Sequence, residues 1–99
     1  MSKKLDKSIV LNYLKEHYPE FKEKYSIEKL GLFGSYARDE ASPESDLDIF
    51  ISMRPSVYDL ISLKEQIEKD LEIKVDIMRE HKNIKPLLLE MIQKDLIYV

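Results

Sequence analysis

The chain has 99 residues, of which 43% are hydrophobic and 35% charged, so we expect residues 1–99 to form one small globular domain. It contains no cysteine, which excludes disulfides and thiolate metal sites and is typical of a cytoplasmic protein; it also lacks the apolar run that a signal peptide or membrane span needs. The net charge of −3 argues against direct nucleic-acid binding, which normally requires a basic face.

The first third of the chain predicts two helical segments, a strand and a short helix. Apolar residues at helical spacing predict an amphipathic helix over residues 4–17. Pro19 then predicts a separate helical turn through Tyr25, because proline is well placed in the first turn of a helix. A strand is expected over 27–33, and a short helix over 35–40.

The rest of the chain continues the alternation of strands and helices. Apolar and polar residues alternate over 47–53 and again over 72–78, which predicts two strands with the isoleucine and valine side chains buried. Between them, Ser56 is expected to cap a helix, and a last helix is expected over 86–96. The buried face of the middle helix is expected to consist of Val57, Leu60, Ile61, Ile67 and Leu71. This order predicts an α+β fold, a two-layer α/β arrangement in which helices pack on a small mixed sheet.

A short segment between the first two strands carries the chemistry. Gly34 and Ser35 are followed, after ten residues, by Asp46 and Asp48. Glycine lets the backbone approach a phosphate closely, and serine adds an N–H and a hydroxyl donor. Two carboxylates at spacing i, i+2 on a strand point to the same side, and Mg²⁺ is usually held by such carboxylates together with substrate phosphates. The segment therefore predicts a site for a nucleoside triphosphate and its metal.

A third carboxylate is expected to join this pair. Burial of the apolar face of strand 72–78 turns Asp76 outward, as burial of the isoleucine face of strand 47–53 turns Asp46 and Asp48 outward. If the two strands are neighbours, all three aspartates converge on one face of the sheet. Such a cluster repels itself unless cations neutralise it, and it is what a two-metal nucleotidyl transfer site requires.

Gly34-Ser35, Asp46-x-Asp48 and the later Asp76 together resemble the polymerase-beta-type nucleotidyltransferase superfamily, and the Gly-Ser-Tyr-Ala-Arg opening resembles its minimal branch. The resemblance covers residues from about 27 to 99. It implies the fold of that family, with two Mg²⁺ ions held by Asp46, Asp48 and Asp76 as the catalytic residues. It also implies that Gly34 and Ser35 bind the phosphates of ATP. The chain departs from many relatives at Asp39, where they have glycine.

The role of Arg38 has two readings. The resemblance implies that this basic residue reaches the nucleotide phosphates. A surface ion pair is the alternative, since charged side chains near a surface often pair with a neighbour.

The resemblance also implies a partner. Minimal members of the superfamily are often encoded beside an all-helical HEPN-type toxin, and some act as antitoxins by transferring AMP to a tyrosine hydroxyl of that toxin. This makes an Mg²⁺-dependent protein adenylyltransferase the leading hypothesis. Two alternatives remain: a non-catalytic antitoxin that neutralises its helical partner by contact, and a subunit that modifies a small molecule. The last helix is apolar around more than one face, which favours a hetero-oligomer with a partner protein.

Overall fold

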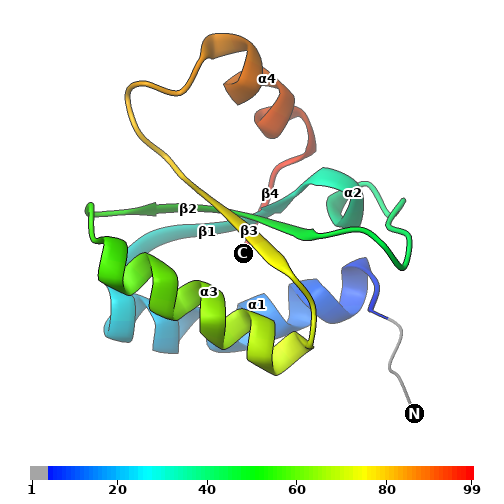
Figure 1. Ribbon diagram of the computed structural model, residues 1–99, viewed down its shortest axis with the longest axis horizontal. Coiled ribbons are helices and arrows are strands. Elements are labelled where there is room, and N and C mark those ends of the chain that lie inside the picture. The colour runs from blue at the N-terminus through cyan, green and yellow to red at the C-terminus, as the bar shows by residue number, and fades with distance from the viewer. Residues whose placement is uncertain (1–4) are drawn as a thin grey trace.

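The computed structural model of the chain describes residues 5–99, so residue 4, where the first helix was expected to start, lies outside the described part. In chain order the elements are α1 (Lys7–Tyr25), β1 (Ile27–Phe33), α2 (Gly34–Ala37), β2 (Leu47–Met53), α3 (Val57–Leu71), β3 (Val75–Arg79), α4 (Pro86–Asp95) and β4 (Ile97–Tyr98). The long helices α1 and α3 cover one face of the sheet, and α4 lies over the other (Figure 1).

The four strands form one mixed sheet in the order β3-β2-β1-β4. β1 pairs antiparallel with β2 and with β4, whereas β2 and β3 are parallel. The predicted α+β class and mixed sheet are therefore confirmed. Because β2 lies in the middle and β3 beside it, the two predicted aspartate-bearing strands are neighbours.

Strand alternation divides the core into two parts. The larger cluster lies between the sheet and helices α1 and α3, and it includes Leu30, Leu32, Ile49, Ile51 and Val75. The smaller cluster lies on the opposite face under α4 and is centred on Phe50, Ile84 and Ile92. The same alternation that buries Ile49 and Ile51 turns Asp48 and Phe50 toward the α4 side of the sheet.

Helix α1 corrects the prediction of two separate helical segments. It runs without a break from Lys7 to Tyr25, with Pro19 inside it. An interior proline removes one backbone hydrogen bond and typically costs about 3 kcal/mol. Here the turns after Pro19 are held by tertiary contacts: Phe21 is fully buried, and the Tyr25 hydroxyl donates to Gln66 Oε1 of α3 at 2.7 Å. Of the helices within residues 5–99, none has the length and apolar character that crossing a membrane requires.

The ends of the sheet also differ from the prediction. Strand β3 begins at Val75 rather than at residue 72, because Glu72 takes a left-handed conformation (φ 52°) where α3 ends. The last helix ends at Asp95, and the residues after it form β4, a strand that the sequence did not predict. Two residues are too few to show an alternating pattern, so β4 exists through its pairing with Gly31 and Leu32 of β1.

The buried face of α3 is only partly as predicted. Leu63, which was not expected to be buried, is fully buried together with Ile67, whereas Val57 and Ile61 are 74% and 50% exposed. The face that meets the sheet follows the spacing Leu60, Leu63, Ile67, so Val57 and Ile61 project beyond it.

This correction predicts different stabilities for two alanine variants of α3. Leu63→Ala should lower the free energy of unfolding by about 3 kcal/mol, because it leaves a cavity in the larger cluster. Ile61→Ala removes a side chain from the same helix and should lower it by less than about 1 kcal/mol. Urea unfolding followed by circular dichroism measures both, and equal losses would contradict the observed face.

Candidate active site

The parallel pairing of β2 and β3 brings the predicted carboxylates together. Asp48 and Asp76 are register partners across the two strands. Both side chains leave the sheet on the face opposite the larger core cluster, and Asp46 lies two residues before Asp48 on the same side. The pairing therefore brings Asp48 and Asp76 together as predicted, whereas the convergence of all three aspartates in one site stays a prediction.

Two contacts fix the start of β3 and so the position of Asp76. The backbone N–H of Val75 donates to Glu68 Oε2 of α3 at 2.9 Å, and the N–H of Leu47 donates to the carbonyl of Lys74 at 2.9 Å. The first contact anchors β3 to α3, and the second joins β3 to β2 at the point where Asp46 precedes the strand. Sequence reasoning missed Glu68, because a carboxylate on a helix surface gives no signal of the strand that it will contact.

Gly34 lies directly against the carboxylate of Asp48. It has a left-handed backbone (φ 77°), and a Cβ built on it would lie 2.1 Å from Asp48 Oδ2. A side chain at position 34 would therefore meet both a steric block and backbone strain. Glycine is therefore required at position 34 by the packing of Asp48, whether or not a phosphate binds there.

The segment around Ser35 forms a tight turn. Helix α2 begins at Gly34, and Phe33 at its N-cap has no polar side-chain atom with which to cap the first turn. The carbonyl of Ser35 accepts from the N–H of Glu40 at 2.9 Å. Asp39 has a left-handed backbone (φ 60°). Aspartate tolerates this conformation better than most residues, so the turn keeps its shape.

The loop before Asp46 is closed by its own side chains. The N–H of Ser42 donates to Ser45 Oγ at 2.9 Å, and the N–H of Ser45 donates back to the carbonyl of Ser42 at 3.0 Å. Such reciprocal bonds shape a turn without help from distant residues. The turn leads to Asp46, the residue directly before β2.

The charge state of Asp48 reflects its neighbours. Desolvation raises the pKa of the Asp48 carboxyl above its ordinary value, the negative charges of Asp76 and Asp46 raise it further, and the charge of Arg38 partly opposes them. Among residues 5–99, however, no three His, Cys, Asp or Glu side chains lie close enough together to hold a metal ion. The carboxylates are near enough to repel one another, as the raised pKa of Asp48 shows, but they do not form a closed set of ligands.

The donor set nevertheless suits Mg²⁺. Carboxylate oxygens are its preferred protein ligands, and a divalent cation would offset the repulsion that raises the pKa of Asp48. Asp46, Asp48 and Asp76 are the residues that would hold it. Their assignment as metal ligands stays a prediction.

The raised pKa of Asp48 predicts a pH-dependent stability difference between the wild type and Asp48→Asn. Below the ordinary pKa of 3.8 the carboxyl is neutral in both the folded and unfolded states, and the difference is smallest. As the pH rises through the folded-state pKa, the ionised form is disfavoured in the folded protein, and the wild type loses stability relative to the variant. Urea unfolding of both proteins in chelator across this pH range measures the effect; a difference that does not change with pH would contradict it.

Arg38 forms an ion pair instead of standing free. Its Nη1 donates to Asp95 Oδ2 at the end of α4 at 2.7 Å, and its Nε lies 3.5 Å from Glu40 Oε2. The ion-pair reading is thus confirmed, while a phosphate contact stays a prediction. Asp95 lies 57 residues from Arg38 in the chain, so no local pattern predicted this contact.

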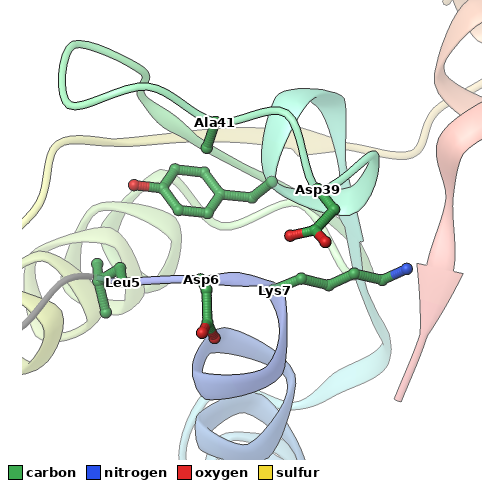
Figure 2. Close-up of a pocket in the computed structure, with 6 residues that line it drawn as sticks. Leu5, Asp6, Lys7, Asp39 and Ala41 are labelled. Carbon is green, nitrogen blue, oxygen red and sulfur yellow. The ribbon is translucent and has the colours of Figure 1, made fainter.

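A hollow of about 310 Å³ lies beside this region, and Asp46, Asp48 and Asp76 do not line it. Its lining residues are Leu5, Asp6, Lys7, Tyr36, Asp39 and Ala41. Figure 2 shows Leu5, Asp6 and Lys7 at the start of α1, facing Asp39 and Ala41 of the segment after α2. No predicted metal ligand lines it, so the hollow and the candidate site are different places.

Comparison with known proteins identifies the family of this chain. The family model described as "Nucleotidyltransferase domain" matches residues 14–99. The protein adenylyltransferase MntA of Thermococcus cleftensis is 32% identical over 88 residues, which cover 87% of this chain and 88% of that protein.

Two solved structures share the fold. One, described provisionally as a minimal nucleotidyltransferase, superposes with a TM-score of 0.76 at 28% identity and covers 94% of this chain and 95% of its own. The other contains a tri-AMPylated HEPN toxin of Shewanella oneidensis in complex with an MNT antitoxin. It superposes with a TM-score of 0.61 at 14% identity over 88% of this chain and 69% of that one, a similarity that speaks to the fold alone.

Proposed function

Because this chain belongs to the nucleotidyltransferase domain family, we propose that it is an Mg²⁺-dependent protein adenylyltransferase that moves AMP from ATP to a hydroxyl of a helical HEPN-type toxin and so acts as its antitoxin. Residues 1–99 act as one nucleotidyltransferase domain, in the cytoplasm. Support for the protein substrate comes from the MntA relative, which is named a protein adenylyltransferase. Support for the toxin comes from the solved complex of an MNT antitoxin with an AMPylated HEPN toxin.

The observation that carries the proposal is the pairing of Asp48 with Asp76 across parallel strands, with Gly34 against Asp48. This arrangement places carboxylates beside the start of α2, where a triphosphate would lie between them and the Gly34-Ser35 backbone. Asp46, Asp48 and Asp76 would hold Mg²⁺, which when bound offsets their repulsion and the charge of the phosphates.

The reaction is an in-line transfer. The acceptor hydroxyl oxygen forms a bond to the α-phosphorus of ATP, the bond from that phosphorus to the oxygen bridging to the β-phosphorus breaks, and pyrophosphate leaves. The hydroxyl gives up its proton, for which Asp76 is the candidate base, since it is the most exposed of the three carboxylates. Gly34 and Ser35 orient the triphosphate through backbone N–H groups and the serine hydroxyl.

The surface of α4 favours a protein acceptor. Leu87 and Met91 are 71% and 62% exposed, and Leu88 is 41% exposed. An exposed apolar stripe of this kind on a small protein is typical of a surface that binds another chain. The same stripe supports the rival function, a non-catalytic antitoxin that neutralises its helical partner by contact.

One experiment separates the two. The protein is incubated with Mg²⁺, its co-purifying or gene-adjacent helical partner, and ATP labelled at either the α- or the γ-phosphate. Label should enter the partner from α-labelled ATP only, and Asp46→Asn should abolish its entry. No transfer from any nucleotide, together with a stable complex and an inhibited partner, would overturn the enzyme in favour of the contact antitoxin.

A further inference from the structure

The ion pair between Arg38 and Asp95 joins two elements that border the candidate site. Arg38 follows α2 directly, and Asp95 is the last residue of α4. The Asp95 side chain is 17% exposed and that of Arg38 is 45% exposed. A partly buried carboxylate therefore pairs with a guanidinium that remains half open to solvent.

The backbone connects Arg38 to the candidate site. The N–H of Arg38 donates to the carbonyl of Gly34 at 3.1 Å, and Gly34 lies against Asp48. Arg38 therefore leaves the chain at the rim of the candidate nucleotide site, and its guanidinium is held by Asp95 at 2.7 Å.

The observed contacts leave part of the guanidinium available. An arginine carries five N–H donors in a fixed plane. Within residues 5–99, the ion pairs of Arg38 engage Nη1, toward Asp95, and Nε, toward Glu40. The Nη2 edge remains for an oxygen of a bound anion, and the planar group can serve both partners at once.

We propose that Asp95 is a positioning residue for nucleotide binding: it holds the Arg38 guanidinium at the rim of the site, ready to meet a triphosphate oxygen. This inference rests on the proposed function. A long side chain that is ordered before the ligand arrives does not have to be ordered on binding, so affinity rises without a new contact. Asp95 itself touches no substrate atom and acts through Arg38.

The test is the affinity for a non-hydrolysable ATP analogue with Mg²⁺, measured by isothermal titration calorimetry on the full chain. Asp95→Asn should weaken binding roughly tenfold, because Arg38 loses its charged anchor. The direction of the change in affinity is informative, because removing a negative charge near a triphosphate would by itself tighten binding. Glu40→Gln is the matched control: it removes the same charge beside the same arginine, from a side chain 68% exposed and 3.5 Å away. It should bind at least as tightly as the wild type.

A second pair of variants distinguishes positioning from a general effect on the fold. In an Arg38→Gln background, Asp95→Asn should cause no further loss of affinity, because its effect passes through Arg38. An equal loss with and without Arg38 would overturn the inference, as would unchanged or tighter binding by Asp95→Asn alone. If the wild type binds no nucleotide, the proposed function falls together with this inference; normal wild-type binding with an unaffected Asp95→Asn variant overturns the inference only.

Discussion

Asp48→Asn should abolish AMP transfer while the protein stays folded. Asp48 lies at the centre of the candidate site, paired with Asp76 and in contact range of the Gly34 backbone. An amide oxygen is neutral, so it holds a divalent cation more weakly than a carboxylate does. We expect the transfer rate to fall by about a thousandfold or more, which corresponds to roughly 4 kcal/mol of barrier. The measurement is the rate at which α-labelled ATP labels the partner.

The same variant should be at least as stable as the wild type. Ionised Asp48 is disfavoured by desolvation and by the charges of Asp76 and Asp46, so the neutral asparagine removes a penalty at neutral pH. Asp59→Asn serves as the matched control, because Asp59 lies in the first turn of α3 and outside the site. It should transfer normally and lose no more than about 1 kcal/mol of helix stabilisation. Normal turnover by Asp48→Asn would remove the basis of the assignment.

Gly34→Ala should also abolish transfer, but by a steric route. The new Cβ would lie 2.1 Å from Asp48 Oδ2, so the carboxylate must move away from its position opposite Asp76. A left-handed backbone at an alanine adds about 1–2 kcal/mol of strain. We expect transfer to fall by about a hundredfold or more, and the midpoint of thermal unfolding to fall with it. Transfer is measured as above, at a temperature where the variant is folded.

Gly31→Ala separates the site effect from the general effect of adding a methyl group. Its Cβ would also be crowded, at 2.7 Å from Leu96 Cδ1 and 3.2 Å from the carbonyl of Ile97. Leu96 joins α4 to β4 and Ile97 begins β4, and the end of the Leu96 side chain can move. Gly31→Ala should therefore lose stability and retain transfer per folded molecule. Equal loss of transfer in both glycine variants would show that the close approach of Gly34 to Asp48 has no special role.

The predicted properties of Asp48 illustrate a conflict between stability and function. A site for a polyanion and a cation holds carboxylates close together before its ligands arrive, and the folded protein bears the repulsion. The backbone shows the same conflict at Gly34, because its left-handed conformation would be strained in any residue with a Cβ. The larger core cluster on the other face of the sheet supplies the stability that allows this.

Local patterns were enough to predict most of the elements. β1 and β2 have the predicted bounds, and β2 was predicted from its alternating side chains. Ser56 caps α3 as predicted, with its Oγ accepting from the N–H of Asp59 at 3.2 Å. The candidate site residues were likewise predictable as a local motif, because Gly34, Asp46 and Asp48 lie within one segment. These features depend on residues that are close together in the chain, so a local sequence pattern is enough to predict them.

By itself, then, the sequence determined which strands carry the aspartates and which face of each strand is apolar. Only the tertiary structure decided that β2 and β3 pair in parallel with Asp48 opposite Asp76, that α1 continues past Pro19, and that the last residues form β4. It also decided that Asp95, 57 residues away, holds Arg38. The physical reason is common to all four: each depends on contacts between segments distant in the chain, whose free energy outweighs or selects among local preferences without leaving a local pattern.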